Sequence, residues 1–249
     1  MARIQLYILV SIVIISAITG WYLINPTEEK PYISEEVSFL ASDGIKISAT
    51  WYVPKELEAP YKPVILSHEF DGDRQDWNPF ISDFVERGYA ILAYDIRGFG
   101  ESQNVDKSEE YYDTLISDIE GAVTYLRTRN DVIIDRIGIV GAQLGGNIAY
   151  AASGYIEEIK VSVVISPSAD IGSLIRGEGV DTFNPHSILF QYLDTERTNI
   201  QPLIDRAEEP KTSRLYRPES PSVRASGISL LHRDLRALSD LLRYLDENL

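Results

Sequence analysis

The stretch Ile133-Ile-Asp-Arg-Ile-Gly-Ile-Val-Gly-Ala-Gln-Leu-Gly-Gly-Asn-Ile-Ala-Tyr150 decides the fold of this 249-residue chain. Residues 137–140 form a short apolar run that is typical of a buried strand, and a helix is expected to open at Leu144. Gly141 and Gly145 flank the turn between the two, and a residue without a Cβ lets a strand and a helix approach closely. The pattern predicts a buried strand that turns sharply into a helix.

Gln143 stands at the centre of this turn. In a turn of the form Gly-x-Ser-x-Gly, the nucleophile elbow, a strained backbone lifts a serine hydroxyl above the sheet. Here the frame reads Gly141-Ala142-Gln143-Leu144-Gly145, so both glycines are kept and glutamine replaces the serine. A side-chain amide cannot be activated as a nucleophile in the way that a hydroxyl or a thiol can. The sequence therefore predicts an intact elbow without its nucleophile.

Strand and helix patterns alternate on both sides of the elbow. Two alternating runs, 37–41 and 45–53, flank Ser42-Asp43-Gly44 and predict an antiparallel hairpin. Further strands are expected at 64–68, 89–94, 161–165, 187–192 and 212–216, and further helices at 77–87, 113–129 and 228–249. Continuous apolar strands separated by amphipathic helices indicate an α/β fold. We expect a mostly parallel, twisted sheet of about eight strands with helices on both faces.

The N-terminus carries a long apolar run, from Ile4 to Ile24. It has about the 20 residues that a helix needs to cross a bilayer, and Trp21 and Tyr22 fall where interfacial aromatic residues are common. We expect a transmembrane anchor over residues 1–26 with the lipid bilayer as its partner, a tether over 27–34 and a globular domain over 35–249 on the extracytoplasmic side. A cleaved signal peptide, which would give a secreted protein, is the alternative.

The composition excludes several classes of function. The chain has 23 Lys and Arg residues against 38 Asp and Glu residues, a formal net charge of −15. Such a charge argues against a nucleic-acid partner, because phosphates require a basic surface. The absence of cysteine removes disulfides and thiolate catalysis, and the three histidines lie far apart in the sequence. We expect no metal site and no cofactor.

Two further stretches resemble motifs of the α/β-hydrolase fold family. Leu66-Ser-His-Glu-Phe-Asp-Gly-Asp-Arg-Gln-Asp-Trp77 resembles the His-Gly-x-x-Gly oxyanion loop after the third strand. Tyr94-Asp-Ile-Arg-Gly-Phe-Gly-Glu-Ser102 resembles the Asp-x-Arg-Gly-x-Gly-x-Ser turn after the fourth. With the elbow, these motifs stand in the order and spacing of that family. The resemblance covers residues 35–249 and is closest to the dienelactone-hydrolase and serine-aminopeptidase-like branches, which implies a compact domain without a large cap.

The resemblance implies a catalytic triad whose positions have changed in this chain. The nucleophile position is Gln143, and Ser226 stands where the family has a histidine before the final helix. A serine hydroxyl cannot accept a proton near neutral pH, so the general base is also expected to be missing. The acid position falls in the loop after the strand at 187–192, on Glu196 or, as a weaker alternative, on Asp194.

The oxyanion loop is altered as well. His68-Glu69 stands where the family has His-Gly, and a carboxylate there opposes the stabilisation of a developing oxyanion. His68 is expected to support the loop rather than to react. The backbone N–H groups of Phe70 and Leu144 are expected to face the crevice. The predicted ligand-binding crevice therefore consists of His68, Glu69, Phe70, Gln143 and Leu144.

Four other residues could take part in a rearranged site. His232 lies within the expected final helix, so its side chain should point away from Gln143. His186 precedes a strand and so belongs to the opposite end of the sheet from the site. Ser166 and Ser168 follow the carboxyl end of a strand, where they could line the crevice.

Three hypotheses for the function follow from these residues. The first is a membrane-anchored, non-catalytic α/β-hydrolase-fold protein that binds an unidentified small molecule or protein through the former active-site crevice. The alternative is a serine-type hydrolase, an esterase or a peptidase, with a rearranged catalytic site. A structural scaffold at a membrane is the third.

Overall fold

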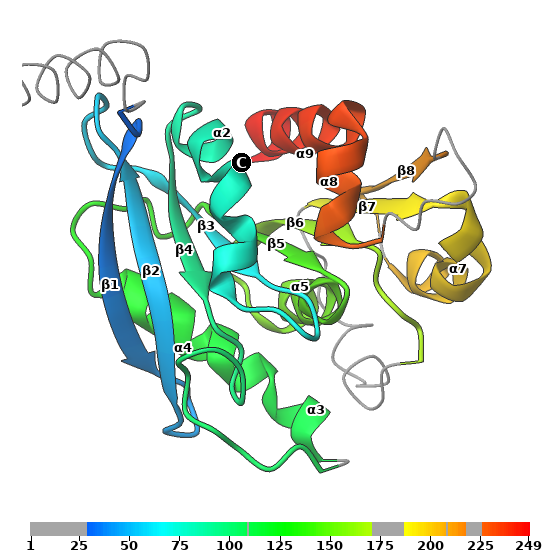
Figure 1. Cartoon of the computed structure of the whole chain (residues 1–249), viewed down its shortest axis with the longest axis horizontal. Helices are drawn as coiled ribbons and strands as arrows, with labels where there is room; N and C mark the ends of the chain where they lie inside the picture. The colour runs from blue at the N-terminus through cyan, green and yellow to red at the C-terminus, as the bar shows by residue number, and fades with distance from the viewer. Residues whose placement is uncertain (1–28, 109, 171–186, 208, 218–225) are drawn as a thin grey trace, which may run out of the picture. The chain divides into compact units, whose positions relative to one another are not determined.

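The structure, a computed structural model, describes residues 29–108, 110–170, 187–207, 209–217 and 226–249 (Figure 1). The apolar run at 4–24 lies outside the described residues, so the transmembrane anchor stays a prediction from the sequence. Among the described residues, no helix combines the length and the apolar content that crossing a membrane requires.

The described residues form one eight-stranded sheet with the strand order β1-β2-β4-β3-β5-β6-β7-β8. The first two pairings, β1 with β2 and β2 with β4, are antiparallel, and all the others are parallel. This confirms the expected hairpin and the mostly parallel sheet. The strands are β1 Tyr32–Leu40, β2 Lys46–Pro54, β3 Lys62–Ser67, β4 Tyr89–Tyr94, β5 Ile137–Ala142, β6 Ile159–Ile165, β7 Ser187–Leu193 and β8 Lys211–Tyr216. Because β1 begins at Tyr32, it includes the last three residues of the range 27–34 that the sequence assigns to a tether.

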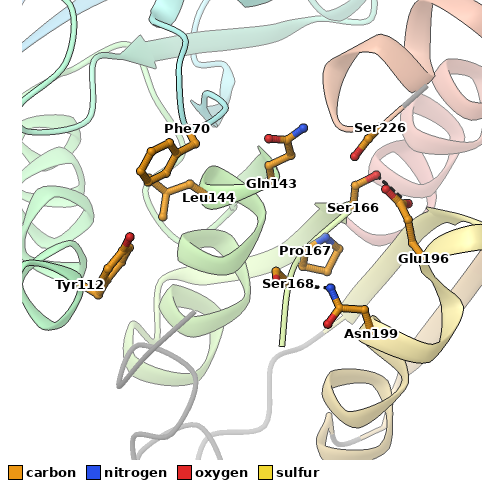
Figure 2. A pocket seen from close by; sticks show the side chains of 10 residues that line it. All are labelled: Phe70, Tyr112, Gln143, Leu144, Ser166, Pro167, Ser168, Glu196, Asn199 and Ser226. Atoms are coloured by element: carbon orange, nitrogen blue, oxygen red, sulfur yellow. Dashed lines mark hydrogen bonds between the residues drawn. The ribbon is translucent and has the colours of Figure 1, made fainter. Parts of the chain in front are cut away.

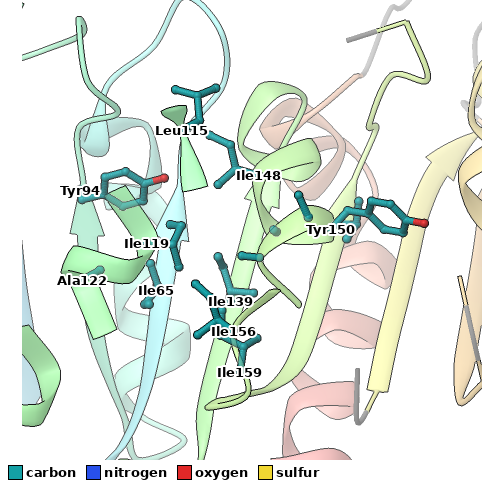
Figure 3. Packing of buried hydrophobic residues seen from close by; sticks show 14 of the residues in the cluster. Ile65, Tyr94, Leu115, Ile119, Ala122, Ile139, Ile148, Tyr150, Ile156 and Ile159 are labelled. Atoms are coloured by element: carbon teal, nitrogen blue, oxygen red, sulfur yellow. The ribbon is translucent and has the colours of Figure 1, made fainter. Parts of the chain in front are cut away.

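Helices cover both faces of the sheet (Figure 1). They are η1 Arg74–Phe80, α2 Ile81–Val85, α3 Tyr111–Thr114, α4 Ile116–Arg127, α5 Leu144–Tyr155, η3 Asp194–Glu196, α7 Arg197–Arg206, α8 Ile228–Arg233 and α9 Leu235–Asn248. The side chains between α4, α5, α7 and the sheet form one buried apolar cluster, and those between η1, α2, α8, α9 and the sheet form another. Figure 3 shows the first cluster, in which Ile65 and Ile139 from the strands meet Ile119 and Ile148 from the helices.

Each of the three long helices expected outside the elbow is broken in two. The helix expected at 77–87 starts earlier, as the 3₁₀ helix η1, and Pro79 lies inside that segment; a proline removes a backbone donor from a regular helix. The helix expected at 113–129 is divided between α3 and α4 at Leu115. The helix expected at 228–249 is interrupted by Asp234, whose backbone is extended and whose side chain accepts a hydrogen bond from the amide of Arg236. Asp234 therefore ends α8 and caps α9.

Helix α7 is absent from the sequence prediction. Its residues are mainly polar, and Pro202 lies within it. Its buried side chains are Ile200, Leu203 and Ile204. A stripe this narrow is a weak helix signal, so the sequence pattern does not predict this helix.

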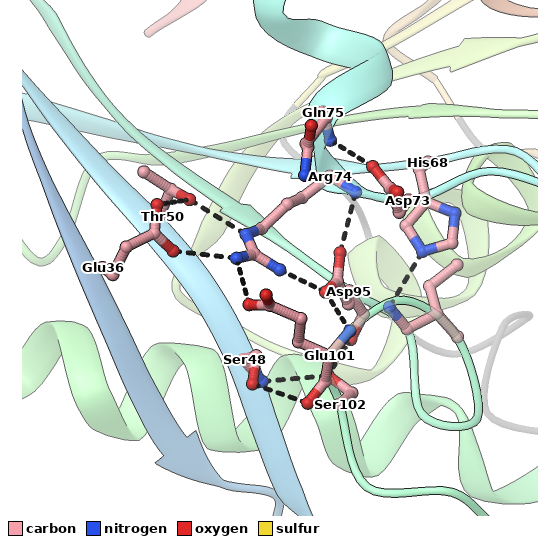
Figure 4. A network of polar contacts seen from close by, with 11 residues as sticks. Glu36, Ser48, Thr50, His68, Asp73, Arg74, Gln75, Asp95, Glu101 and Ser102 are labelled. Carbon is pink, nitrogen blue, oxygen red and sulfur yellow. Dashed lines mark hydrogen bonds and ion pairs between the residues drawn. The ribbon is translucent and has the colours of Figure 1, made fainter.

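A buried ion-pair network joins the loop after β3 to the loop after β4 (Figure 4). The Arg74 guanidinium contacts Asp95, which is fully buried, and also Glu36 and Glu101, whose side chains are 69% and 71% exposed. Asp95 accepts further hydrogen bonds from the amides of Arg74 and Glu101. The network fixes the course of the loop that carries residues 68–70 into the site.

We predict that Asp95→Ala lowers the free energy of unfolding by about 3–5 kcal/mol, because it leaves the buried Arg74 guanidinium without its buried partner. Glu101→Ala, which removes an exposed partner of the same guanidinium, is the matched control and should cost no more than about 1 kcal/mol. Urea unfolding measures both variants. Equal losses would show that burial of the pair is not what fixes the loop.

Candidate functional site

The elbow predicted around Gln143 is present in the structure. Gln143 lies between β5 and α5 with φ 48° and ψ −110°, in the left-handed half of φ/ψ space that L-residues seldom adopt. Its amide donates to the carbonyl of Ile165 at 2.9 Å. Its carbonyl accepts from the amide of Asn147 at 3.0 Å and from Asn147 Nδ2 at 3.1 Å. These bonds hold the strained backbone, which places the Gln143 side chain at the carboxyl edge of the sheet.

Two glycines make the close approach of α5 to the sheet possible. A Cβ on Gly141 would lie 1.9 Å from the carbonyl oxygen of Gly145, and a Cβ on Gly145 would lie 2.2 Å from the carbonyl oxygen of Ser67. No side chain fits at either distance. Backbone packing therefore requires glycine at both 141 and 145, the two glycines of the predicted elbow.

A cavity of about 400 Å³ opens beside Gln143 (Figure 2). Three residues of the predicted crevice, Phe70, Gln143 and Leu144, line it, and so do the other two triad positions, Glu196 and Ser226. Segments far apart in the sequence thus meet at one place, as the resemblance implied. The remaining lining residues are Tyr112, Ser166, Pro167, Ser168 and Asn199.

Phe70 and Leu144, whose backbone amides the resemblance assigns to an oxyanion hole, both line the cavity. Neither the amide of Phe70 nor that of Leu144 donates a hydrogen bond to another described residue. The next amide, that of Gly145, donates to the carbonyl of His68 at 3.1 Å, which ties α5 to the loop after β3. The loop and the helix end therefore keep the arrangement in which the two amides could serve a bound oxygen atom.

His68 supports the loop and does not line the cavity. Its side chain is fully buried; Nε2 accepts a hydrogen bond from the amide of Ile96 at 3.0 Å, and Nδ1 donates to the carbonyl of Glu69 at 2.6 Å. Burial lowers the pKa of the imidazole. With both ring nitrogens engaged, His68 cannot act as a base toward a residue in the cavity. Its placement in the predicted ligand-binding crevice was wrong, and its expected supporting role matches these contacts.

Glu69 also lies outside the cavity lining, contrary to the prediction. Its carboxylate accepts a hydrogen bond from the amide of Ile228, the first residue of α8. A Cβ on Gly227 would lie 2.0 Å from Glu69 Oε1 and 3.0 Å from Gln143 Cγ, so the carboxylate stands between the elbow and the start of α8. Burial raises the pKa of Glu69. The carboxylate expected to oppose an oxyanion therefore caps α8 beside the nucleophile position.

Glu196, at the acid position, is hydrogen-bonded to a serine. Glu196 Oε2 accepts hydrogen bonds from Ser166 Oγ at 3.0 Å and from the amide of Leu193 at 2.8 Å. Ser166 has φ 47°, a second strained residue at the carboxyl end of a strand. Asp194, the weaker candidate, faces Arg217 at 3.8 Å and does not line the cavity.

None of the described histidines reaches the cavity. His232 is exposed on α8, and its ring lies 4.5 Å from that of Phe80, as expected of a side chain that points away from Gln143. His186 lies outside the described residues; Ser187, the next residue, begins β7 at the amino edge of the sheet, away from the site. Ser226, at the position of the family's histidine, lines the cavity with a hydroxyl.

Three lining residues were missed by the sequence analysis: Tyr112, Pro167 and Asn199. Asn199 lies on α7, which was not predicted, and Tyr112 lies on the short helix α3. Neither belongs to a motif. Pro167 stands between Ser166 and Ser168, so only its position after a strand could have indicated it.

The family model of the serine aminopeptidases, S33, matches residues 58–197, which is more than half of the chain. The chain belongs to this family. The protein YfhR of Salmonella typhi is 33% identical over 128 residues, which cover 50% of this chain and 42% of YfhR. The chain spans less than two thirds of the length of this and three further curated relatives, between 42% and 60% of each.

Solved structures confirm the α/β-hydrolase fold. The hypothetical protein PA2218 from Pseudomonas aeruginosa superposes with a TM-score of 0.74 at 17% identity, over 89% of this chain and 95% of that one. The acetyl xylan esterase from Paenibacillus sp. R4 gives a TM-score of 0.69 at 18% identity, over 90% of this chain and 87% of that one. At such identities the likeness establishes the fold and leaves the substrate open.

We predict that Gln143→Gly raises the free energy of unfolding by about 1 kcal/mol, because glycine relieves the strain of φ 48° at a smaller entropic cost. Ala142→Gly is the matched control: the neighbouring position is an ordinary strand residue, and the change should lower stability by about 1 kcal/mol. Denaturant unfolding of both variants measures the difference. A loss of stability in Gln143→Gly would mean that the glutamine side chain stabilises the folded state by more than the strain of its backbone destabilises it.

Proposed function

We propose that this chain is a non-catalytic member of the serine aminopeptidase family, and that it binds a ligand through the cavity beside Gln143. The observation that carries the proposal is the residue at the elbow. The strained backbone that would present a nucleophile presents an amide side chain instead, and an amide cannot form the covalent intermediate. An amide offers both a donor and an acceptor, which suits it to binding.

The surroundings of Gln143 support the same proposal. A catalytic base would need an imidazole within hydrogen-bonding reach of the elbow, and Ser226 supplies only a hydroxyl there. The Glu69 carboxylate, bound to the start of α8, adds negative charge next to the place where an oxyanion would form. Three changes at separate places in the chain thus act against one reaction.

A rearranged serine hydrolase is the second candidate, and one observation favours it. Ser166 Oγ donates to the Glu196 carboxylate at 3.0 Å, at a strained residue on the cavity wall. A carboxylate can accept a proton from a hydroxyl that attacks a carbonyl carbon, although it is a weaker base than an imidazole. Ser166 is therefore the residue on which residual activity would depend.

We expect the full-length protein to give no covalent adduct with a fluorophosphonate probe and no enzymatic turnover of p-nitrophenyl acetate. The combined change Gln143→Ser, Ser226→His and Glu69→Gly should restore weak esterase activity, since it returns a nucleophile, a base and an unobstructed oxyanion site. Gln143→Ser alone, the matched control, should remain inactive because it lacks the base. Intact-protein mass spectrometry and absorbance assays measure both outcomes. Labelling of the unchanged protein that Ser166→Ala abolishes would overturn the proposal in favour of the rearranged hydrolase.

A further inference from the structure

The cavity beside Gln143 has two chemically different walls (Figure 2). On one side lie the side chains of Phe70, Leu144 and Tyr112, which are aromatic or apolar. On the other side hydroxyl, carboxylate and amide groups gather, from Ser166, Ser168, Glu196, Asn199 and Ser226. Gln143 stands between the walls. A ligand that satisfies this cavity has an apolar face and a polar edge.

The apolar wall is presented by a supported aromatic ring. Phe70 is 40% exposed although it is a large hydrophobic residue. Its ring lies 5.8 Å from that of Phe99 in an edge-to-face arrangement, and Lys107 Nζ lies 3.2 Å from the Phe99 ring centroid. The ring is therefore held in place while part of its surface stays available to a ligand. Exposed, ordered aromatic rings are suited to contact with apolar C–H groups.

The polar wall has unused hydrogen-bonding capacity. Both hydrogen bonds of Glu196 fall on Oε2, which leaves Oε1 without a described partner. Asn199 Nδ2 donates to Ser168 Oγ at 3.4 Å, and the Asn199 Oδ1 atom has no described partner. The side-chain amide of Gln143 likewise makes no hydrogen bond within the described part of the chain. Donors and acceptors in close alternation match hydroxyl groups, which both donate and accept.

The charge of the described cavity lining disfavours anionic ligands. Its lining contains one carboxylate, that of Glu196, and no lysine or arginine among the described residues. The Glu69 carboxylate lies near Gln143, since a Cβ on Gly227 would contact both side chains. A carboxylate or phosphate group on a ligand would be repelled at this place. A purely hydrocarbon ligand is disfavoured for another reason. It would displace water from the polar wall without offering hydrogen-bond partners in return.

We propose that the cavity binds a neutral saccharide, with the C–H face of a sugar ring against Phe70 and its hydroxyl groups on Glu196, Asn199 and Gln143. The inference rests on the proposed function in one respect: the cavity binds its ligand without reacting with it. A volume of about 400 Å³ lies within the range of small-molecule sites. The recognising groups are the side chains named above, and neither a metal nor a cofactor is needed.

Saturation-transfer NMR on the full-length protein tests the proposal, in a detergent without sugar groups such as lauryldimethylamine oxide. The neutral probes are cellobiose, xylobiose, methyl α-mannoside and N-acetylglucosamine, and the comparison probes are glucuronate, glucosamine and butyl acetate. We expect at least one neutral sugar to bind, with the strongest saturation on its ring C–H protons, and glucuronate to bind at least tenfold more weakly.

Two variants and a control locate the binding. Phe70→Ala and Asn199→Ala should each weaken the binding of the same sugar about tenfold, equivalent to about 1.4 kcal/mol. Tyr155→Ala, which removes a similarly exposed aromatic ring at the other end of α5, should leave it unchanged. Binding that survives both cavity variants would overturn the proposal, because the sugar would then lie elsewhere.

The outcomes for the saccharide and for the proposed function are distinguishable. Failure of every neutral sugar to bind overturns the saccharide inference, and binding of butyl acetate or of glucosamine alone would identify an ester or an amine as the ligand class instead. Neither result implies covalent labelling by the fluorophosphonate probe. The proposal of a non-catalytic binding protein is therefore compatible with both. Conversely, sugar binding together with a Ser166 adduct would support the saccharide and overturn the non-catalytic proposal.

Discussion

The structure depends on the close contact between the start of α5 and the carboxyl ends of β3 and β5. Gly145 packs against the carbonyl of Ser67 at a distance that excludes any side chain. Beside that contact the backbone of Gln143 is strained, and the amide of Gly145 binds the carbonyl of His68, which ties the loop after β3 to the helix end. The cavity and its two unused amides follow from this single approach.

Around that contact, the polar side chains near the elbow are hydrogen-bonded to loops and helix ends. The acid position, Glu196, holds Ser166 and the amide of Leu193. Glu69 caps α8, and His68 uses both of its ring nitrogens inside the loop. The fold of a hydrolase is thus retained while its polar groups stabilise loops and helix ends. The fold alone therefore does not determine the function of this chain.

Much of this arrangement could be predicted from the sequence because it is governed by local pattern. Strand periodicity predicted the sheet, and the glycine spacing located the elbow and, through it, Gln143. The contacts of Glu69 could not be predicted, since its hydrogen bond to Ile228 joins residues 159 positions apart. Asn199 was missed because α7 is too polar for its hydrophobic stripe to stand out. A local sequence pattern does not reveal which distant residue a side chain will contact in the folded chain.

The most direct test of the central claim, that no imidazole serves a hydroxyl at this site, is a pH titration of the three histidines by long-range ¹H–¹⁵N NMR on the full-length protein. Burial lowers the pKa of His68, so its ring should gain its second proton at a lower pH than a free imidazole does, and the neutral ring should carry its proton on Nδ1. We predict that removing the Ser166 hydroxyl in Ser166→Ala leaves the ring signals of all three histidines unchanged. An imidazole whose titration shifts when the Ser166 hydroxyl is removed would contradict the account.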